Sequence, residues 1–410
     1  MSAAGEVVYL DNNATTKVAP EVLEEMLPYF SEKYGNPSSM HDFGGQVAKK
    51  LNEARERVAA LLGADPTEIV FTSCGTESDN HALRGTLESY PEKRHLVTTR
   101  VEHPAVRSLC QYLGRRGHDV TELPVDSDGL LNEDEFGASV HEGTALASIM
   151  WANNETGVMF PVERLAEIAH EKGVVFHTDA VQVVGKVPLD LRHGAIDLLS
   201  LSGHKLHAAK GVGVLYIRRG TRIRPLLIGG HQERERRGGT ENVASIIGLG
   251  KACELARQTI EEERTRVKEL RDKLQRELLA RAPDARVNGH LEQRLPNTLS
   301  ISFEYVEGEA ILLMLSRLGI CASSGSACTS GSLEPSHVLR AMGVPFSAAH
   351  GSIRFSLSRY TTEAEVDYAI EHVPQVVKRL REISPFGRGA TDRDARMEYG
   401  RGSAPPGGGS

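Results

Sequence analysis

Short apolar runs alternate with helical stretches along much of the chain. Seven runs between about residues 68 and 217 are rich in apolar and β-branched residues: EIVFT, HLVTT, VTELPV, ALASIMWAN, GVVFHTD, IDLLSLS and GVGVLYI. Continuous apolar runs of this length are typical of strands that are buried on both faces. The pattern therefore predicts an α/β fold with a mostly parallel seven-stranded sheet that helices cover on both sides.

The hydrophobic pattern changes between about residues 257 and 282. Here Ile260, Val267, Leu270, Leu274 and Leu278 recur at spacings of three, four and seven on a charged background, which predicts a long amphipathic helix between two domains. A strand in NTLSISFEYV, a helix through EAILLMLSRLG, a strand in SIRFSLS and a helix over 362–383 follow and predict a smaller α+β domain. We expect residues 15–260 to form the large domain, and residues 1–14 and 261–385 the small one.

Composition and charge narrow the class of protein. Of the 410 residues, 40% are apolar and 25% charged, and the net charge of -7 has the wrong sign for a nucleic-acid partner. No apolar run approaches the roughly 20 residues that cross a bilayer, and the start lacks a secretory layout. We therefore expect a soluble cytoplasmic protein with no membrane partner. Residues 386–410 contain too few apolar side chains to offset the entropy of ordering, which predicts a disordered tail.

The five cysteines are odd in number, scattered and never in a CxxC pair, so neither a disulfide framework nor a zinc ribbon is expected. Cys110 and Cys253 fall in helical patterns and are expected to be structural. Cys321 follows an apolar run, which predicts that it is buried. Cys74 sits in a tight turn and could line a cofactor. Cys328 lies in the Ser/Gly-rich segment CASSGSACTSGSLEPSH, where a small exposed thiol on a mobile loop is chemically available.

Polar clusters follow five of the predicted strands directly. EIVFT runs into SCGTES, HLVTT into RVEHP, ASIMWA into NNETG, VVFHT into DAVQ, and LLSLS into GHK. In an open parallel sheet, ligands bind beyond the carboxyl ends of the strands. A single polar residue in such a place is usually a turn or a helix cap. Five clusters together indicate a site for one small polar ligand.

The first cluster predicts a phosphate site. Ser73, Gly75, Thr76, Glu77 and Ser78 lie where a strand passes into a helix, and free amide groups together with the helix dipole attract an anion there. The alternative is an ordinary capping box that runs from Ser73 to Thr76.

Three further clusters suggest which cofactor carries that phosphate. Asp179 ends a strand, where a carboxylate needs a positive partner such as a protonated ring nitrogen, and Gln182 can reach the same ligand. His103 is either a structural histidine or a flat ring that stacks on an aromatic cofactor. Lys205, in SGHKLHAAKG, is either a phosphate contact or a Schiff-base nucleophile. With Asp179 and the phosphate site, it favours pyridoxal 5'-phosphate, whose chemistry needs a lysine and an acidic partner.

One arginine has two interpretations. Arg354 in the strand SIRFSLS alternates with the apolar Ile353 and Phe355, a pattern typical of a surface arginine. It could equally clamp a substrate carboxylate through two hydrogen bonds.

At this point the chain strongly resembles the pyridoxal phosphate-dependent cysteine desulfurases of the NifS type. The resemblance runs from YLDNNATT to the helix near residue 383 and rests on SGHK, HTDAVQ, ANNETG, EHPAV, RGGTEN and SSGSACTSGSLEPSH. It implies the aspartate-aminotransferase fold, a homodimer with shared active sites, and conversion of L-cysteine to L-alanine. It also implies transfer of the sulfur to an iron–sulfur scaffold protein. SCGTESD, MWANNETG and KLHAAKG favour the nitrogen-fixation branch.

The resemblance also implies a role for each residue of the site. Lys205 would bind the cofactor covalently, Asp179 would hold its ring nitrogen, and His103 would be a catalytic base that stacks on its ring. The other implied contacts are Gln182 to the ring hydroxyl; Gly75, Thr76, Ser202, His204 and the partner subunit's Thr240 to the phosphate; Asn154 and Arg354 to the substrate carboxylate; and Cys328 to the sulfur. One departure is Ala209, which stands where relatives commonly have proline.

Three other functions share much of this pattern. A selenocysteine lyase of the same fold would use almost every residue named above. A metal-dependent hydrolase could use scattered ligands, although no compact motif such as HExxH is present; the candidates are His103, His177, Asp179, His204 and Cys328. A pyridoxal-binding scaffold that mainly binds an iron–sulfur assembly partner is the third alternative.

Overall fold

The seven predicted strands form one sheet in the computed structural model, which describes residues 7–324 and 335–383. They are β2 (Ile69–Thr72), β3 (His95–Thr99), β4 (Asp119–Leu123), β5 (Thr144–Ser148), β6 (Val175–Asp179), β7 (Leu198–Ser202) and β8 (Gly213–Ile217). Their order is β2-β8-β7-β6-β5-β3-β4, and only β8 runs antiparallel to its neighbours. The predicted α/β fold with a mostly parallel sheet is confirmed.

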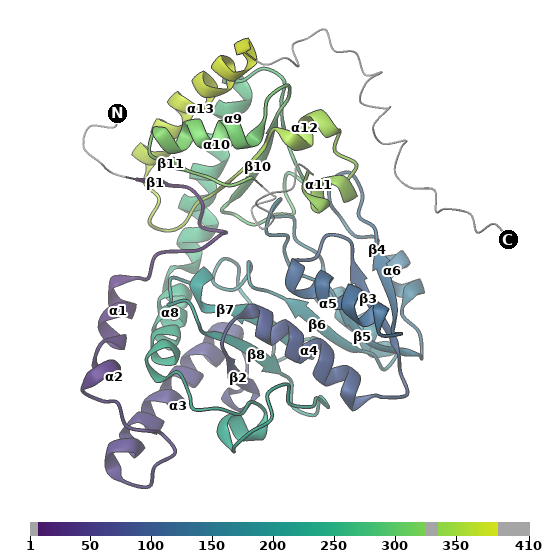
Figure 1. Ribbon diagram of the computed structural model, residues 1–410, viewed down its shortest axis with the longest axis vertical. Helices are drawn as coiled ribbons and strands as arrows, with labels where there is room; N and C mark the ends of the chain where they lie inside the picture. Colours follow the sequence, from purple (N-terminus) through teal and green to yellow (C-terminus); the bar gives the residue numbers. More distant parts are fainter. Residues whose placement is uncertain (1–6, 325–334, 384–410) are drawn as a thin grey trace, which may run out of the picture.

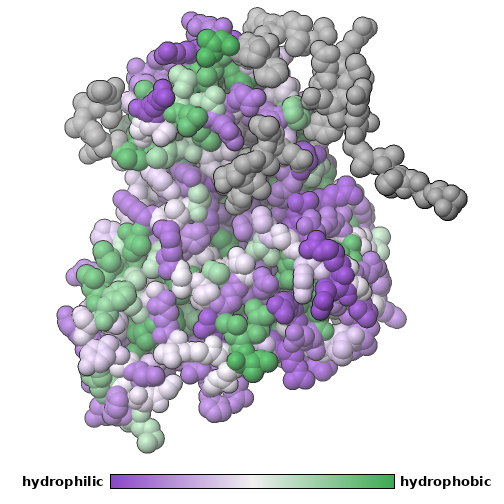
Figure 2. Space-filling model, viewed as in Figure 1, coloured by the Kyte–Doolittle hydropathy of each residue, from purple (hydrophilic) through white to green (hydrophobic). Residues whose placement is uncertain are grey.

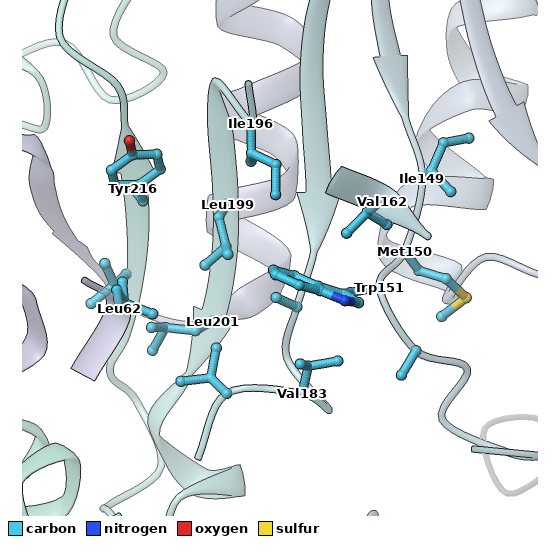
Figure 3. Packing of buried hydrophobic residues seen from close by; sticks show 14 of the residues in the cluster. Leu62, Ile149, Met150, Trp151, Val162, Val183, Ile196, Leu199, Leu201 and Tyr216 are labelled. Atoms are coloured by element: carbon cyan, nitrogen blue, oxygen red, sulfur yellow. The ribbon is translucent and has the colours of Figure 1, made fainter. Parts of the chain in front are cut away.

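Helices cover both faces of this sheet, as its apolar strands require (Figure 1). On one face, Leu198 and Leu215 pack with residues of α4 (Gly75–Ser89) and α5 (Pro104–Arg115). On the other face, Leu199 and Leu201 pack with Tyr216 and with residues of α3 (Asp42–Leu62), α7 (Val162–Glu171) and α8 (Val243–Glu262). Figure 3 shows this second cluster. Because helices cover both faces of the central strands, a ligand can reach this sheet at its strand ends.

One long helical rod connects the sheet to the rest of the chain. It consists of α8, a π-helical turn (Glu263–Val267) and α9 (Lys268–Arg281). The predicted helix over 257–282 therefore begins earlier, at Val243. Residues 244–250 are all buried against neighbouring helices, so they show no amphipathic stripe from which the helix could be predicted.

A second apolar cluster lies beyond the rod. Strand β10 (Thr298–Phe303) pairs antiparallel with β9 (Ala285–Val287) and β12 (Ser352–Ser356), while β1 (Val8–Tyr9) pairs in parallel with β11 (Ile320–Cys321). α9, α10 (Gly308–Arg317) and α13 (Glu363–Ile383) complete this cluster. By contrast, α11 (His337–Ala341) and α12 (Phe346–His350) contribute to the core of the large sheet. The proposed limits of the two domains, 15–260 against 1–14 with 261–385, stay a prediction.

The remaining helices lie at the outside of the large sheet. They are α1 (Pro20–Met26), α2 (Pro28–Ser31) and α6 (Glu133–Ser139). Large apolar side chains are exposed on α1, on α2 and in the segment before α3, and green residues gather over α1 in Figure 2. They include Leu23, Leu27, Phe30, Tyr34 and Met40. Among the described helices, none combines the length and apolarity needed to span a membrane.

Candidate active site

The polar clusters that follow the parallel strands meet at one edge of the sheet. Asp179 ends β6, Lys205 lies in the 3-10 turn after β7, and His103 caps α5 after β3. The charges of Asp179 and Lys205 both act on His103, and those of His103 and Lys205 act on Asp179. The structure therefore brings these three predicted residues together, as the carboxyl ends of a parallel sheet should.

Lys205 is held by the N-terminal segment of the chain. Its Nζ donates to the carbonyl oxygens of Asn13 and of Ala14, the latter at 2.7 Å. Burial, reinforced by the charges of Arg354 and Lys186, lowers the pKa of Lys205 to about 7. A large fraction of this amine is therefore neutral at neutral pH, which is the form that can attack a carbonyl carbon or accept a proton.

Asp179 is a buried acid at the end of β6, with 6% of its surface exposed. It accepts a hydrogen bond from the amide of Val181 at 3.0 Å. Burial raises the pKa of Asp179, while the charges of His103 and Lys205 lower it. A ligand that presents a positive N–H to this carboxyl would stabilise the ionised form.

A second buried acid lies behind Asp179. Asp79 of α4 is 1% exposed, and its Oδ1 has no hydrogen-bond partner. Burial, followed by the charge of Asp179, raises the pKa of Asp79 well above its usual range. Its neighbour His177, whose Nε2 lies 3.6 Å from Asp79 Oδ1, is fixed by Ser148 at 2.8 Å and Ser200 at 3.0 Å. The sequence alone gave Asp79 no role, because within a helix it resembles any polar residue.

The predicted phosphate site lies at the start of α4, close to the end of β7. A side chain on Gly75 would place its Cβ 3.0 Å from Val181 Cγ2 and 3.5 Å from Ser202 Cβ. Glycine therefore lets the first turn of this 15-residue helix approach the strand ends with its free amide groups. Ser202 is buried and Thr76, in the same helical turn as Gly75, is exposed.

The alternative capping box at this helix is wrong. Cys74 is the N-cap residue, and no side chain caps the helix. Glu77 instead accepts from the amide of Ser73 at 2.9 Å and pairs with Arg237 at 2.8 Å. Burial raises the pKa of Glu77, but the hydrogen bonds from Arg237 and Ser73 outweigh it and lower that pKa overall. Ser78 is also engaged, because its hydroxyl contacts the hydroxyl of Thr72 at 2.8 Å.

Two other predicted cofactor contacts are tied to the N-terminal segment. His204 Nδ1 lies 3.1 Å from Thr15 Oγ1, and burial together with the charges of Lys205 and Lys210 lowers its pKa to about 4. His204 is therefore a neutral hydrogen-bonding group. Gln182 is buried, and its Nε2 donates to Asn13 O at 3.1 Å.

Arg354 is buried, so its interpretation as a surface residue is wrong. All five residues of β12 are buried, since both faces of this strand are covered, and alternation along it says nothing of exposure. The guanidinium donates to Asn154 O at 2.8 Å and to Asp11 Oδ1 at 2.9 Å, while its Nε has no partner. The positive charge of this guanidinium, next to the half-buried Asn154, is suited to an anionic substrate group.

Two predicted residues, Cys328 and Thr240, are not part of the group of residues described above. Cys328 lies outside the described residues. Thr240 is exposed, three residues after the Arg237 that pairs with Glu77.

Four cysteines are described, and all are free thiols. Cys110 and Cys253 are buried, and burial raises the pKa of each to about 12. Cys321 was expected to be buried but is only partly so, because its short strand β11 pairs with β1 alone. Cys74 is also partly exposed.

Two acids near the site were not predicted. Asp11 pairs with Arg354, and Glu102 precedes His103. Glu102 accepts from the amide of Met150 at 3.0 Å and from Thr99 Oγ1 at 2.8 Å, yet its Oε2 is unpaired. Burial raises the pKa of Glu102 to about 8. Asp11 lies within YLDNNATT, but its partner is 343 positions away, so local sequence could not assign it.

The described residues fit pyridoxal phosphate. The start of α4 provides amide groups for a phosphate, Asp179 is a buried acid that lacks a full positive partner, and Lys205 is largely neutral. By contrast, among the described side chains no three His, Cys, Asp or Glu residues are grouped to hold a metal ion. That part of the chain gives the hydrolase alternative no support.

Comparison with known families decides between the remaining interpretations. The family model of class-V aminotransferases matches residues 8–369. The chain belongs to the class-V aminotransferase family.

Individual relatives narrow the assignment within the family. A cysteine desulfurase from a Nostoc species is 62% identical over 380 residues, which cover 93% of this chain and 95% of the relative. The cysteine desulfurase NifS of Azotobacter vinelandii is 60% identical over 383 residues, with coverage of 93% and 95%. A solved NifS-like protein is 43% identical with a TM-score of 0.86, covering 92% of this chain and all of that one. The prediction of a pyridoxal phosphate-dependent cysteine desulfurase is confirmed.

Proposed function

We propose that this cysteine desulfurase works as a homodimer that supplies sulfur for iron–sulfur cluster assembly, specifically for maturation of nitrogenase. The observation that carries the chemistry is the buried Lys205, whose pKa of about 7 and closeness to Asp179 suit both covalent binding of the cofactor and proton transfer. The name NifS of the Azotobacter vinelandii relative supports the nitrogen-fixation role. L-cysteine is the substrate and the cytoplasm the proposed location.

Each residue of the site has a separate task in the first half of the reaction. Pyridoxal phosphate, when bound, supplies a ring that accepts electrons from the substrate carbon. Asp179 would hold the proton of the ring nitrogen, and His103 would cover one ring face. Lys205 would take the proton from the substrate α-carbon. Arg354 and Asn154 would hold the substrate carboxylate.

The phosphate contacts follow from the start of α4. Gly75 and Thr76 lie in its first turn, and Ser202 lies beside Gly75. The free amide groups of that turn favour an anion. His204 is neutral and adds a hydrogen bond without adding charge. Gln182 would contact the ring hydroxyl.

The second half of the reaction needs Cys328. Its thiolate would attack the substrate sulfur, and the substrate carbon–sulfur bond would break with its electron pair left on the carbon side. The sulfur would then join Cys328 as a persulfide, alanine would leave after protonation, and an iron–sulfur scaffold protein would accept the sulfur. In Cys328→Ala, cysteine should still change the absorption spectrum but form no persulfide. A persulfide formed at the normal rate would assign the role to another cysteine, with Cys74 examined next.

A homodimer accounts for two surface features. Exposed apolar side chains on and between α1 and α2, including Leu23, Leu27 and Phe30, are typical of a protein interface. Thr240 is exposed in this chain, although the resemblance assigns it a phosphate contact. Both features suit a site completed by the partner subunit's Thr240.

Mixing two inactive variants tests the shared site. Lys205→Ala subunits keep Thr240, and Thr240→Ala subunits keep Lys205, so a mixed dimer contains one intact site. Equal amounts should form mixed dimers in about half of all pairs, and activity should rise well above the mean of the parents. If subunits exchange and activity stays at that mean, Thr240 does not act across the dimer.

The overall activity is tested by an absorption spectrum of the purified protein before and after L-cysteine, with alanine and sulfide measured. We expect a yellow protein, a spectral change, and equal amounts of alanine and transferred sulfur. Rates on cysteine and selenocysteine separate the desulfurase from a selenocysteine lyase. A yellow protein that turns over neither substrate would support the scaffold alternative.

A further inference from the structure

A buried lysine behind the site has no place in the proposed chemistry. Lys186 follows the end of β6 and is 7% exposed. Its Nζ donates to Gln182 O at 2.9 Å and lies 3.4 Å from Gln182 Oε1. Burial lowers the pKa of Lys186 to about 8. Burying an ammonium costs free energy. The contacts between Lys186 and Gln182, a proposed cofactor residue, therefore suggest a functional role for this lysine.

The contact with Lys186 determines how Gln182 is oriented. An amide side chain can present either its oxygen or its nitrogen to a neighbour. A cation beside Oε1 fixes the oxygen on the side of Lys186, and Nε2 then donates to Asn13 O at 3.1 Å. The same Asn13 carbonyl accepts a hydrogen bond from Lys205. A continuous chain of hydrogen bonds thus runs from Lys186 through Gln182 and Asn13 to Lys205.

The opposite charge comes from the helical rod. Glu263 opens the π-helical turn between α8 and α9 and is 7% exposed. One carboxylate oxygen accepts from the amide of Arg359 at 3.1 Å, while Oε2 has no partner. Burial raises the pKa of Glu263 to about 7, and the charge of Lys186 opposes that rise. A π-helical turn often marks a functional position in a helix.

A small polar cavity lies between these groups. Its volume is ≈ 20 Å³, and Lys186, Lys205, Glu263 and Arg359 are among its lining residues. This space holds about one water molecule. An ammonium has three N–H groups, and Gln182 accounts for two of those of Lys186. The third is available to a water that also serves the unpaired Oε2 of Glu263.

We propose that Lys186 is a positioning residue of the reaction: held by Glu263 through the cavity water, it fixes the amide of Gln182 toward the cofactor and places a positive charge behind Lys205. This inference rests on the proposed cofactor contact of Gln182. It also explains the position of the π-helical turn, because that turn places the carboxylate of Glu263 opposite Lys186.

The charge of Lys186 has a measurable consequence for Lys205. The charged groups that act on Lys205 are Arg354 and Lys186, which lower its pKa, and Asp11 and Asp179, which raise it. Those that act on Lys186 are Glu263 and Arg354. Neutralising Lys186 should therefore raise the pKa of Lys205 and shift the pH at which its amine becomes reactive.

The test removes pyridoxal phosphate from the full-length enzyme and measures its rebinding. The variants are Lys186→Met, which lacks the charge, and Lys186→Arg, which keeps it. Lys251→Met, which alters a half-buried lysine on α8, is the control. For each, equilibrium titration gives the affinity, and absorbance against pH gives the midpoint for covalent attachment to Lys205. Lys186→Met should weaken binding about tenfold or more and move the midpoint upward. Lys186→Arg should restore the midpoint, and the control should change neither quantity.

Further variants guard against misfolding and test the partner. If Lys186→Met does not fold, Lys186→Gln can still donate to Gln182 and should move the midpoint with a smaller loss of affinity. Glu263→Gln should weaken binding in the wild-type background but add little to Lys186→Met, because both changes break one unit. Exposed Glu261→Gln is its control.

The two proposals fail in different ways. If the wild-type protein does not bind pyridoxal phosphate at all, the proposed function fails. If the wild type binds it and Lys186→Met, or Lys186→Gln in its place, leaves both affinity and midpoint unchanged, the positioning role of Lys186 is overturned alone.

Discussion

Two buried polar networks in this molecule are built in opposite ways. In the small sheet, the Nδ2 of Asn288 lies 3.2 Å from Ser300 Oγ, 2.9 Å from Ser302 Oγ and 3.2 Å from Ser352 Oγ, and its Oδ1 accepts from Ser302 at 3.1 Å. All these groups are neutral and paired. Such a network holds three strands together at no cost in buried charge.

The strand-end site of the large sheet contains charged groups that are poorly paired. Asp79 Oδ1, Glu102 Oε2 and Arg354 Nε have no hydrogen-bond partner, and burial shifts the pKa values of Lys205 and Asp179 toward their neutral forms. The comparison shows where the fold gains stability and where it gives stability up for chemistry. Changes in the first network should alter unfolding, and changes in the second should alter turnover.

The largest effect should come from Lys205→Ala. Activity should fall about a thousandfold or more, because the covalent attachment point and the base are lost together. Without cofactor, the variant should unfold at the same or a higher temperature than the cofactor-free wild type, since a buried amine has been removed. Alanine production and thermal unfolding are the measurements. A variant that is less stable but still active would show that Lys205 serves stability and not catalysis.

Asn288→Ala should have the opposite signature. The change leaves the hydroxyls of Ser300, Ser302 and Ser352 without their shared partner, which should cost about 3 kcal/mol of unfolding free energy. Turnover per folded molecule should stay at the wild-type level. Denaturant titration and alanine production measure the two quantities, and Asn80→Ala, which alters a half-buried asparagine of α4, serves as the control. A loss of turnover with unchanged stability would contradict the assignment.

Glu102→Gln should change how the stability of the protein depends on pH. The pKa of Glu102 is about 8 in the folded protein and about 4.3 when unfolded, so folding favours its protonated form. Its contribution to stability is present below pH 4.3 and is lost as pH rises through 8. The glutamine variant should therefore gain stability relative to the wild type by about 2 kcal/mol between pH 5 and pH 7. If the difference in unfolding free energy between variant and wild type is the same at pH 5 and pH 7, Glu102 is already ionised in the folded protein.

The smallest effect should come from an exposed ion pair on the rod. Lys268 lies 2.8 Å from Asp272, and their side chains are 53% and 37% exposed. Lys268→Ala should change the unfolding free energy by no more than about 0.5 kcal/mol, with no change in turnover. A much larger loss would mean that surface charges contribute to this fold as strongly as the Asn288 network.

The sequence predicted some residues of the strand-end site far better than others. Continuous apolar runs and the polar residues that end them located all the strands of the large sheet and brought Lys205, Asp179 and His103 to one edge. These signals are local, because a strand and the turn after it are neighbours in the chain. Arg354 was misjudged because burial of both faces of β12 depends on helices from elsewhere in the chain. Lys186 and Glu263 gave no signal, since 77 positions separate residues whose relation is set only by packing.

The central claim is that Lys205 is the residue to which pyridoxal phosphate is covalently bound. Reduction of the yellow protein with borohydride, followed by proteolysis and mass spectrometry, tests it directly. We expect the pyridoxyl group on the peptide that contains Lys205, and unmodified peptides for Lys186 and Lys210. A pyridoxyl group on another lysine, or none in a protein that still converts cysteine to alanine, would contradict the assignment of the site.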